Sequence, residues 1–161
     1  IGDEVLCTIN QVRRNKNTTM HTVQHIVSAI ANDMFSAETV GNQISEEYTR
    51  IDLLFPDREK FNSEDLQQAV NDIIKSNKNV RIHNWERERI LAHEQMRHTK
   101  FMDRIPDTVK ELRVVEIVDV DLCPCGGTHV DNTSKLDEMS ITNVKSKGAG
   151  KLRISYSLNN H

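Results

Sequence analysis

Apolar residues recur along the chain with a helical period in some segments and with alternation in others. Apolar positions three and four residues apart predict a helix over about residues 20–35, capped by Thr18 or Thr19. The same spacing predicts a second helix over residues 63–75, which has acids in its first turn. A charged stretch over residues 86–100 predicts a third helix that lies in solvent.

Shorter segments rich in β-branched residues separate these helices and predict strands. They are residues 39–45, 48–55, 79–85, 112–120, 139–144 and 151–158, and the first ten residues read as a turn followed by a further short strand. The last two segments flank KSKGAG, which predicts a terminal hairpin. The pattern indicates an α+β domain over residues 1–161, with a mostly antiparallel sheet packed against helices in two layers.

Composition narrows the class of protein. The chain has 161 residues, 37% of them apolar and 28% charged, which fits one globular domain. No apolar run approaches the roughly 18 residues of a membrane span, and three cysteines favour a reducing, cytoplasmic setting. A first residue other than methionine suggests the C-terminal part of a longer chain.

Two short motifs carry side chains that bind metals. HTVQH places His21 and His25 four apart, on one side of the predicted helix. CPCGGTHV places Cys125 and His129 in a glycine-containing turn that can aim both at one ion. Together they form a tetrahedral donor set of the kind that zinc accepts.

Thr22 and Cys123 bear on other interpretations of these motifs. Thr22 stands where a thermolysin-type protease carries its catalytic glutamate, which excludes that reading. Cys123 is a spare ligand, although a small apolar residue leading into the turn is its simpler role. The helical period turns the histidine side towards a cleft or solvent.

HTVQH and CGGTHV, about a hundred residues apart, resemble the editing domain of alanyl-tRNA synthetases and of the free-standing AlaX-type editing proteins. RR at 13 and 14, TVGNQI, RVVEI and KGAGKLRISYSL extend the resemblance over essentially the whole chain. It implies hydrolysis of a wrongly attached amino acid, chiefly serine and also glycine, from tRNA(Ala). It also implies zinc ligation by His21, His25, Cys125 and His129, and pocket roles for Thr39 and Gln43.

Two basic runs are candidate contacts for the tRNA. Lys145, Lys147, Lys151 and Arg153 occur around glycines with no acid among them, and Arg13, Arg14 and Lys16 precede the first histidine. The net charge of -3 means that a nucleic-acid surface must be local. Few aromatic residues favour contacts to the backbone and shape of the acceptor stem.

Rival functions remain open at this point. A structural-zinc module that binds RNA or protein without chemistry predicts a closed, buried site. A zinc hydrolase of small molecules predicts a deep pocket with a carboxylate base, and none stands beside the ligand motifs. The excised editing domain of a full-length synthetase is a third reading. Zinc could either activate water or position the substrate.

Overall fold

A computed structural model describes residues 2–97, 102–103 and 105–159 of the chain. Within these residues the helices are α1 (Gln11–Phe35), α2 (Ser63–Lys75) and α3 (Arg87–Ala92). Short 3-10 turns lie at Arg58–Lys60 and Thr133–Lys135. None of the helices in the described part is long and apolar enough to cross a membrane.

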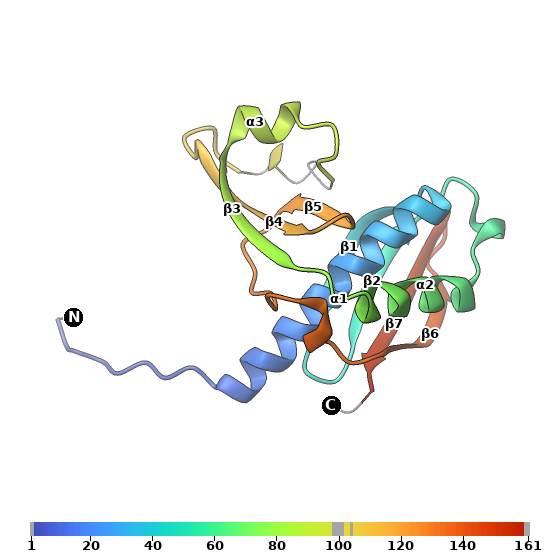
Figure 1. Cartoon of the computed structure of the whole chain (residues 1–161), viewed down its shortest axis with the longest axis horizontal. Coiled ribbons are helices and arrows are strands. Elements are labelled where there is room, and N and C mark those ends of the chain that lie inside the picture. The colour runs from blue at the N-terminus through green and yellow to red at the C-terminus, as the bar shows by residue number, and fades with distance from the viewer. Residues whose placement is uncertain (1, 98–101, 104, 160–161) are drawn as a thin grey trace.

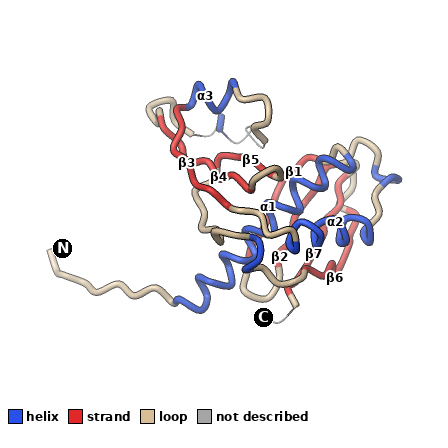
Figure 2. Tube along the Cα trace, viewed as in Figure 1, coloured by secondary structure: helices blue, strands red, loops and turns tan. Residues whose placement is uncertain are grey.

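The strands form two antiparallel sheets (Figures 1 and 2). The larger sheet has the order β1-β2-β7-β6 and comprises β1 (Glu38–Ile44), β2 (Thr49–Leu54), β7 (Lys151–Leu158) and β6 (Met139–Ser146). The smaller sheet has the order β3-β4-β5 and comprises β3 (Val80–Glu86), β4 (Glu111–Ile117) and β5 (Asp121–Pro124). The predicted α+β class and antiparallel pairing are confirmed, with the strands divided between two sheets.

Helix α1 is the centre of the core. Alternate residues of β2 and β7 are buried, and they present apolar side chains to α1 and α2. The helix is buried on nearly all sides from Met20 to Ala31, because the larger sheet covers one side and β5 of the smaller sheet another. The buried Tyr156 hydroxyl donates to the Met20 carbonyl at 2.9 Å, which ties β7 to the helix.

The first helix begins earlier than its apolar pattern predicts. Asn10 caps it by accepting from the Arg13 backbone N–H at 3.0 Å, and the first two turns are exposed. The expected N-terminal strand is absent from residues 2–10, which run away from the domain in Figure 1. Val5 and Leu6, the apolar residues of this predicted strand, are 80% and 95% exposed and pair with no strand of the described chain.

Two further elements differ from their predicted extents. Helix α3 ends at Ala92, and part of the predicted segment, residues 98–100, lies outside the described residues. The expected long strand over 112–120 ends at Ile117, because Asp119 adopts a left-handed φ of 63° and the Val120 N–H donates to the Ile117 carbonyl. The chain thus turns back into β5, which the sequence pattern did not indicate.

Asn71 joins α2 to β6 through a buried side-chain amide. Its Nδ2 donates to the Met139 carbonyl at 2.9 Å, and its Oδ1 accepts from the Met139 N–H at 2.8 Å. The amide therefore satisfies both backbone groups of one strand residue inside the core.

Replacement of this amide is expected to destabilise the fold. Asn71→Ala leaves both Met139 backbone groups unpaired and should lower the free energy of unfolding by about 2–4 kcal/mol in urea titrations. Gln68→Ala, on the exposed face of the same helix, is the matched control and should change stability little. Equal stability of the two variants would show that the bridge contributes nothing.

Candidate metal centre

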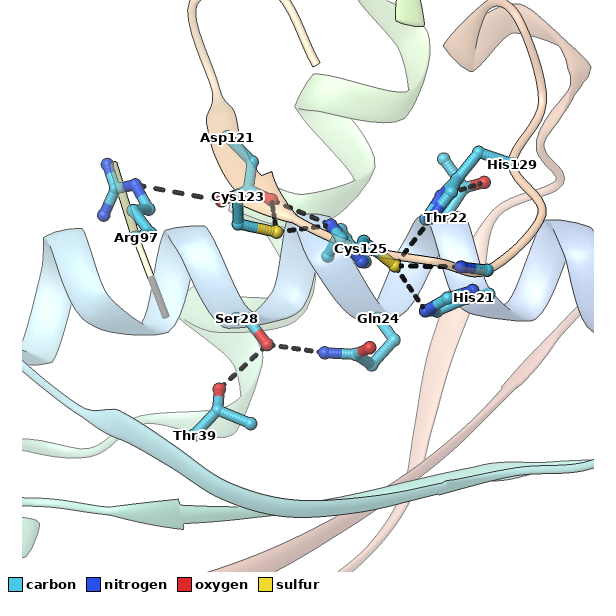
Figure 3. Close-up of polar contacts among 12 residues, drawn as sticks. His21, Thr22, Gln24, Ser28, Thr39, Arg97, Asp121, Cys123, Cys125 and His129 are labelled. Carbon is cyan, nitrogen blue, oxygen red and sulfur yellow. Dashed lines mark hydrogen bonds and ion pairs between the residues drawn. The ribbon is translucent and has the colours of Figure 1, made fainter. Parts of the chain in front are cut away.

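Four side chains from two distant segments meet beside α1 (Figure 3). The helix supplies His21 and His25, and the loop after β5 supplies Cys125 and His129. The Cys125 Sγ lies 3.6 Å from the His21 Nε2 and 3.5 Å from the His129 Nε2. One ligand atom from each residue lies within 4.8 Å of the others.

These separations match the donor geometry of zinc. Bond lengths of about 2.3 Å to sulfur and 2.0–2.1 Å to nitrogen, at a tetrahedral angle, place the two atoms about 3.5 Å apart. The set of one thiolate and three imidazoles is also one that zinc prefers. The residues present therefore fit this ion in both chemistry and spacing.

The two cysteines of the motif differ in their ability to become thiolates. Burial alone would raise the pKa of Cys125, but the imidazoles of His129, His21 and His25 around its Sγ lower it to about 3. Burial raises the pKa of Cys123 to about 12, so this residue stays a thiol. Because the thiolate is the form that binds metal, Cys125 is the better ligand.

Asp121 is a member of the centre that sequence reasoning missed. Its side chain is fully buried, and its Oδ2 lies 2.9 Å from the His25 Nδ1 and 3.4 Å from the Cys123 Sγ. Arg97 approaches the other carboxylate oxygen at 3.9 Å. Asp121 lies in β5, which the sequence pattern did not indicate, and the alternation of that strand puts Asp121 and Cys123 on one face. The expectation of no carboxylate near the ligand motifs is therefore wrong.

The glycine pair has an unequal role. A Cβ on Gly127 would lie 2.1 Å from the His21 Cε1, whereas one on Gly126 would meet nothing within 4 Å. Arg113 of β4 holds the loop in this position, since its Nη1 donates to the carbonyls of Cys125 and Gly127 at 2.7 Å each. Only Gly127 is thus required for the close approach of loop and helix.

The histidine side of α1 is more enclosed than the helical period predicted. His25 is buried under β5, whereas His21 is partly exposed. An open cavity of about 380 Å³ lies beside it and is lined by Arg14, Asn17, His21, Ile44, Gly126, Gly127 and Thr128. Access to the centre is therefore from the side of His21.

The structure separates the two predicted pocket residues. Thr39 faces α1, and its hydroxyl donates to the Ser28 Oγ at 2.9 Å. Gln43 lies opposite Arg50 of β2. Arg50 alternates with the buried residues of that strand, so the side chains of Arg50 and Gln43 both face away from the helix. Asn42, opposite the buried Ile51, is on the helix side instead. The β-bulge between Thr39 and Gly41 changes the alternation, and no local pattern in the sequence predicts it.

The basic residues lie near opposite ends of α1. Arg14 lines the cavity beside His21, and Arg13 pairs with Glu46 at 3.4 Å. The turn that carries Lys147 and Lys151 lies near the other end, where the Gly150 carbonyl accepts from Phe55 and the Phe55 ring contacts Phe35. Lys145, Lys147 and Lys151 are exposed.

Arg153, the fourth residue of this basic run, is paired with a carboxylate. Its Nε and Nη2 donate to the two carboxylate oxygens of Asp52 at 2.6 and 2.7 Å. These hydrogen bonds lower the pKa of Asp52. The charge of Arg153 is therefore largely neutralised within the sheet.

Comparison with known proteins finds related sequences over nearly the whole chain. Residues 112–155, which include Cys125 and His129, match the family described as the threonyl and alanyl tRNA synthetase second additional domain. The chain is 31% identical over 160 residues to the alanyl-tRNA editing protein AlaX-M of Methanosarcina barkeri, covering 98% of this chain and 64% of that protein. It is 32% identical over 158 residues to AlaX-M of Saccharolobus solfataricus, covering 98% and 65%.

A synthetase also matches over most of the chain. The alanine–tRNA ligase of Nitrosopumilus maritimus is 28% identical over 165 residues, covering 96% of this chain and 17% of the ligase. The chain spans less than two thirds of the length of the AlaX-M relatives. By these matches, and with an α+β fold, the chain is similar to the AlaX-type alanyl-tRNA editing proteins.

Proposed function

We propose that the chain is a zinc-dependent hydrolase that removes a wrongly attached amino acid from tRNA(Ala), chiefly serine and also glycine. The observation that carries the proposal is the convergence of His21, His25, Cys125 and His129 in a chain similar to the editing proteins. These four side chains would hold the zinc ion. A bound zinc ion supplies Lewis acidity, which polarises a carbonyl or lowers the pKa of a water.

The cavity beside His21 supports access for the aminoacylated 3′ end. Arg14 offers positive charge there, and Asn17 and Thr128 offer polar side chains. We infer that Arg14 binds a terminal phosphate while the backbone of Gly126 and Gly127 leaves room for the ester. A purely structural zinc site would be closed on all sides, and the partly exposed His21 favours the hydrolase instead.

Selection of serine over alanine is assigned to Thr39. The Ser28 Oγ accepts from the Thr39 hydroxyl and also from the Gln24 Nε2 at 2.8 Å (Figure 3). Because the Thr39 hydroxyl donates its proton to Ser28, the Thr39 oxygen can accept a hydrogen bond from a serine hydroxyl. Alanine and glycine would both leave that acceptor unpaired, so this contact favours serine over either of them, and glycine would be the slower of the two substrates.

The proposed reaction can be tested directly. The chain should deacylate serylated and glycylated tRNA(Ala), leave alanylated tRNA(Ala) intact, and lose activity with a chelator until zinc is restored. The measurement is release of labelled amino acid over time. Equal hydrolysis of all three substrates, or full activity in the metal-free protein, would contradict the proposal.

The two cysteines should differ sharply when substituted. Cys125→Ser removes a thiolate of low pKa and should weaken zinc binding by more than about 100-fold. This loss is larger than the one usually seen when a residue that only hydrogen-bonds to a metal ligand is replaced. Cys123→Ser keeps a small hydrogen-bonding group beside His25 and should change affinity by less than about tenfold. Competition with a chromophoric chelator measures both, and the reverse ranking would show that Cys123 is the ligand.

The glycine pair provides a second matched comparison. Gly127→Ala forces a Cβ against the His21 ring and should weaken zinc binding by about 10- to 100-fold. Gly126→Ala meets open space and should bind zinc like the wild-type chain. Isothermal titration with zinc distinguishes them. Similar affinities in the two variants would mean that the loop does not hold the observed position when metal binds.

Binding of tRNA is expected to depend on the exposed lysines of the β6–β7 turn. From Arg14 to Phe35 the helix rises about 30 Å, so a tRNA that contacts both basic runs must lie along α1. Replacing Lys147 and Lys151 with Ala should weaken tRNA binding and make its salt dependence shallower. Zinc content and single-turnover deacylation at saturating protein should stay near wild type.

The outcome of that experiment locates the RNA. An unchanged salt slope would place the tRNA on another surface, with Arg14→Ala as the next variant to measure. Slow deacylation at saturating protein would mean that the two lysines shape the active site rather than bind phosphate.

A further inference from the structure

Two threonines on successive turns of α1 contact the loop that carries His129. The Thr18 hydroxyl donates to the Arg14 carbonyl at 2.8 Å, and the Thr22 hydroxyl donates to the Thr18 carbonyl at 2.9 Å. Each hydroxyl has one proton, and it donates that proton in a hydrogen bond to a backbone carbonyl of the helix. Both oxygens can then act only as acceptors towards the loop.

The loop supplies matching donors. The Thr22 Oγ1 accepts from the Val130 N–H at 3.2 Å and lies 3.2 Å from the His129 Nδ1 (Figure 3). The Thr18 Oγ1 lies 2.8 Å from the Thr128 hydroxyl. Because the Thr22 oxygen has no proton left to give, its contact with His129 requires a proton on Nδ1. The His129 Nε2 lone pair is then free, on the side of the Cys125 Sγ at 3.5 Å.

We propose that Thr22 is a positioning residue that fixes His129 as the Nδ1–H tautomer and aims its Nε2 at the metal, with Thr18 securing the loop. This inference rests on the proposed zinc site but not on the identity of the amino acid that is removed. Thr22 is fully buried, so solvent does not compete for its hydroxyl. His25 has a comparable arrangement, with its Nδ1 against the Asp121 carboxylate.

The proposal gives a role to the second residue of HTVQH. In H-E-x-x-H proteases the side chain at this position serves as the general base. Here the helix uses the same position to orient a fourth ligand from another segment, 107 residues further along the chain. Histidines that bind metals generally have their second ring nitrogen fixed in this way.

Valine and serine substitutions at Thr22 distinguish the effect of its hydroxyl group from the effect of its packing. Thr22→Val keeps the branched shape and removes the acceptor, and zinc binding should weaken by about 10- to 100-fold in chelator competition on the whole chain. Thr22→Ser keeps the hydroxyl and should stay close to wild type. Thr49→Val, at a buried threonine on β2, is the control that alters the core without changing zinc affinity.

The tautomer itself is measured by ¹⁵N NMR of the histidine side chains in the metal-free wild-type chain. His129 should carry its proton on Nδ1, and Thr22→Val should lose this preference. A proton on Nε2 in the wild-type chain overturns the proposal, even if Thr22→Val does not fold. Wild-type zinc affinity in Thr22→Val also overturns it. Failure to deacylate seryl-tRNA, with zinc binding and tautomer as expected, would refute the hydrolase function alone.

Discussion

The close contact between the Cys125 thiolate and the imidazoles of His21 and His129 is the constraint on which the rest of the site depends. The imidazoles around the Cys125 Sγ lower the pKa of this thiol to about 3, and they come from segments 104 residues apart. The contact forms only if the loop after β5 lies directly on α1. Gly127 permits that approach, Arg113 holds the loop backbone, and the buried Asp121 fixes the helix histidine nearest to β5.

The position of α1 between two sheets provides this contact. The larger sheet binds the helix through apolar side chains and the Tyr156 hydroxyl, whereas the smaller sheet brings polar and metal-binding groups to the adjacent side. One helix thus serves as a core element and carries half of the candidate metal centre. His21 is partly exposed beside a cavity, so the candidate centre is accessible from that side.

The sequence predicted the α+β class, the antiparallel pairing and most strand positions, because alternation and helical periods report directly which side of an element is buried. It did not predict β5 or the end of β4, because the turn at Asp119 lies within a continuous apolar run. The exposed first turns of α1 carry no apolar stripe, so their helical state depended on the Asn10 cap.

The four candidate ligands followed from spacing and donor type, and the structure brings all four together. Asp121, Arg113 and Thr22 act through tertiary contacts that no local pattern reports. Gln43 lies on the opposite face of β1 from Thr39 for a related reason, since a bulge one residue long moves every later side chain of β1 to the other face.

Zinc K-edge X-ray absorption of the loaded chain tests most directly whether the two segments share one ion. We expect a four-coordinate or five-coordinate zinc with one sulfur ligand at about 2.3 Å and three imidazole nitrogens at about 2.0 Å. Two sulfur ligands would place Cys123 in the coordination shell, and a shell without sulfur would remove Cys125 from it. Either result would contradict the centre described here.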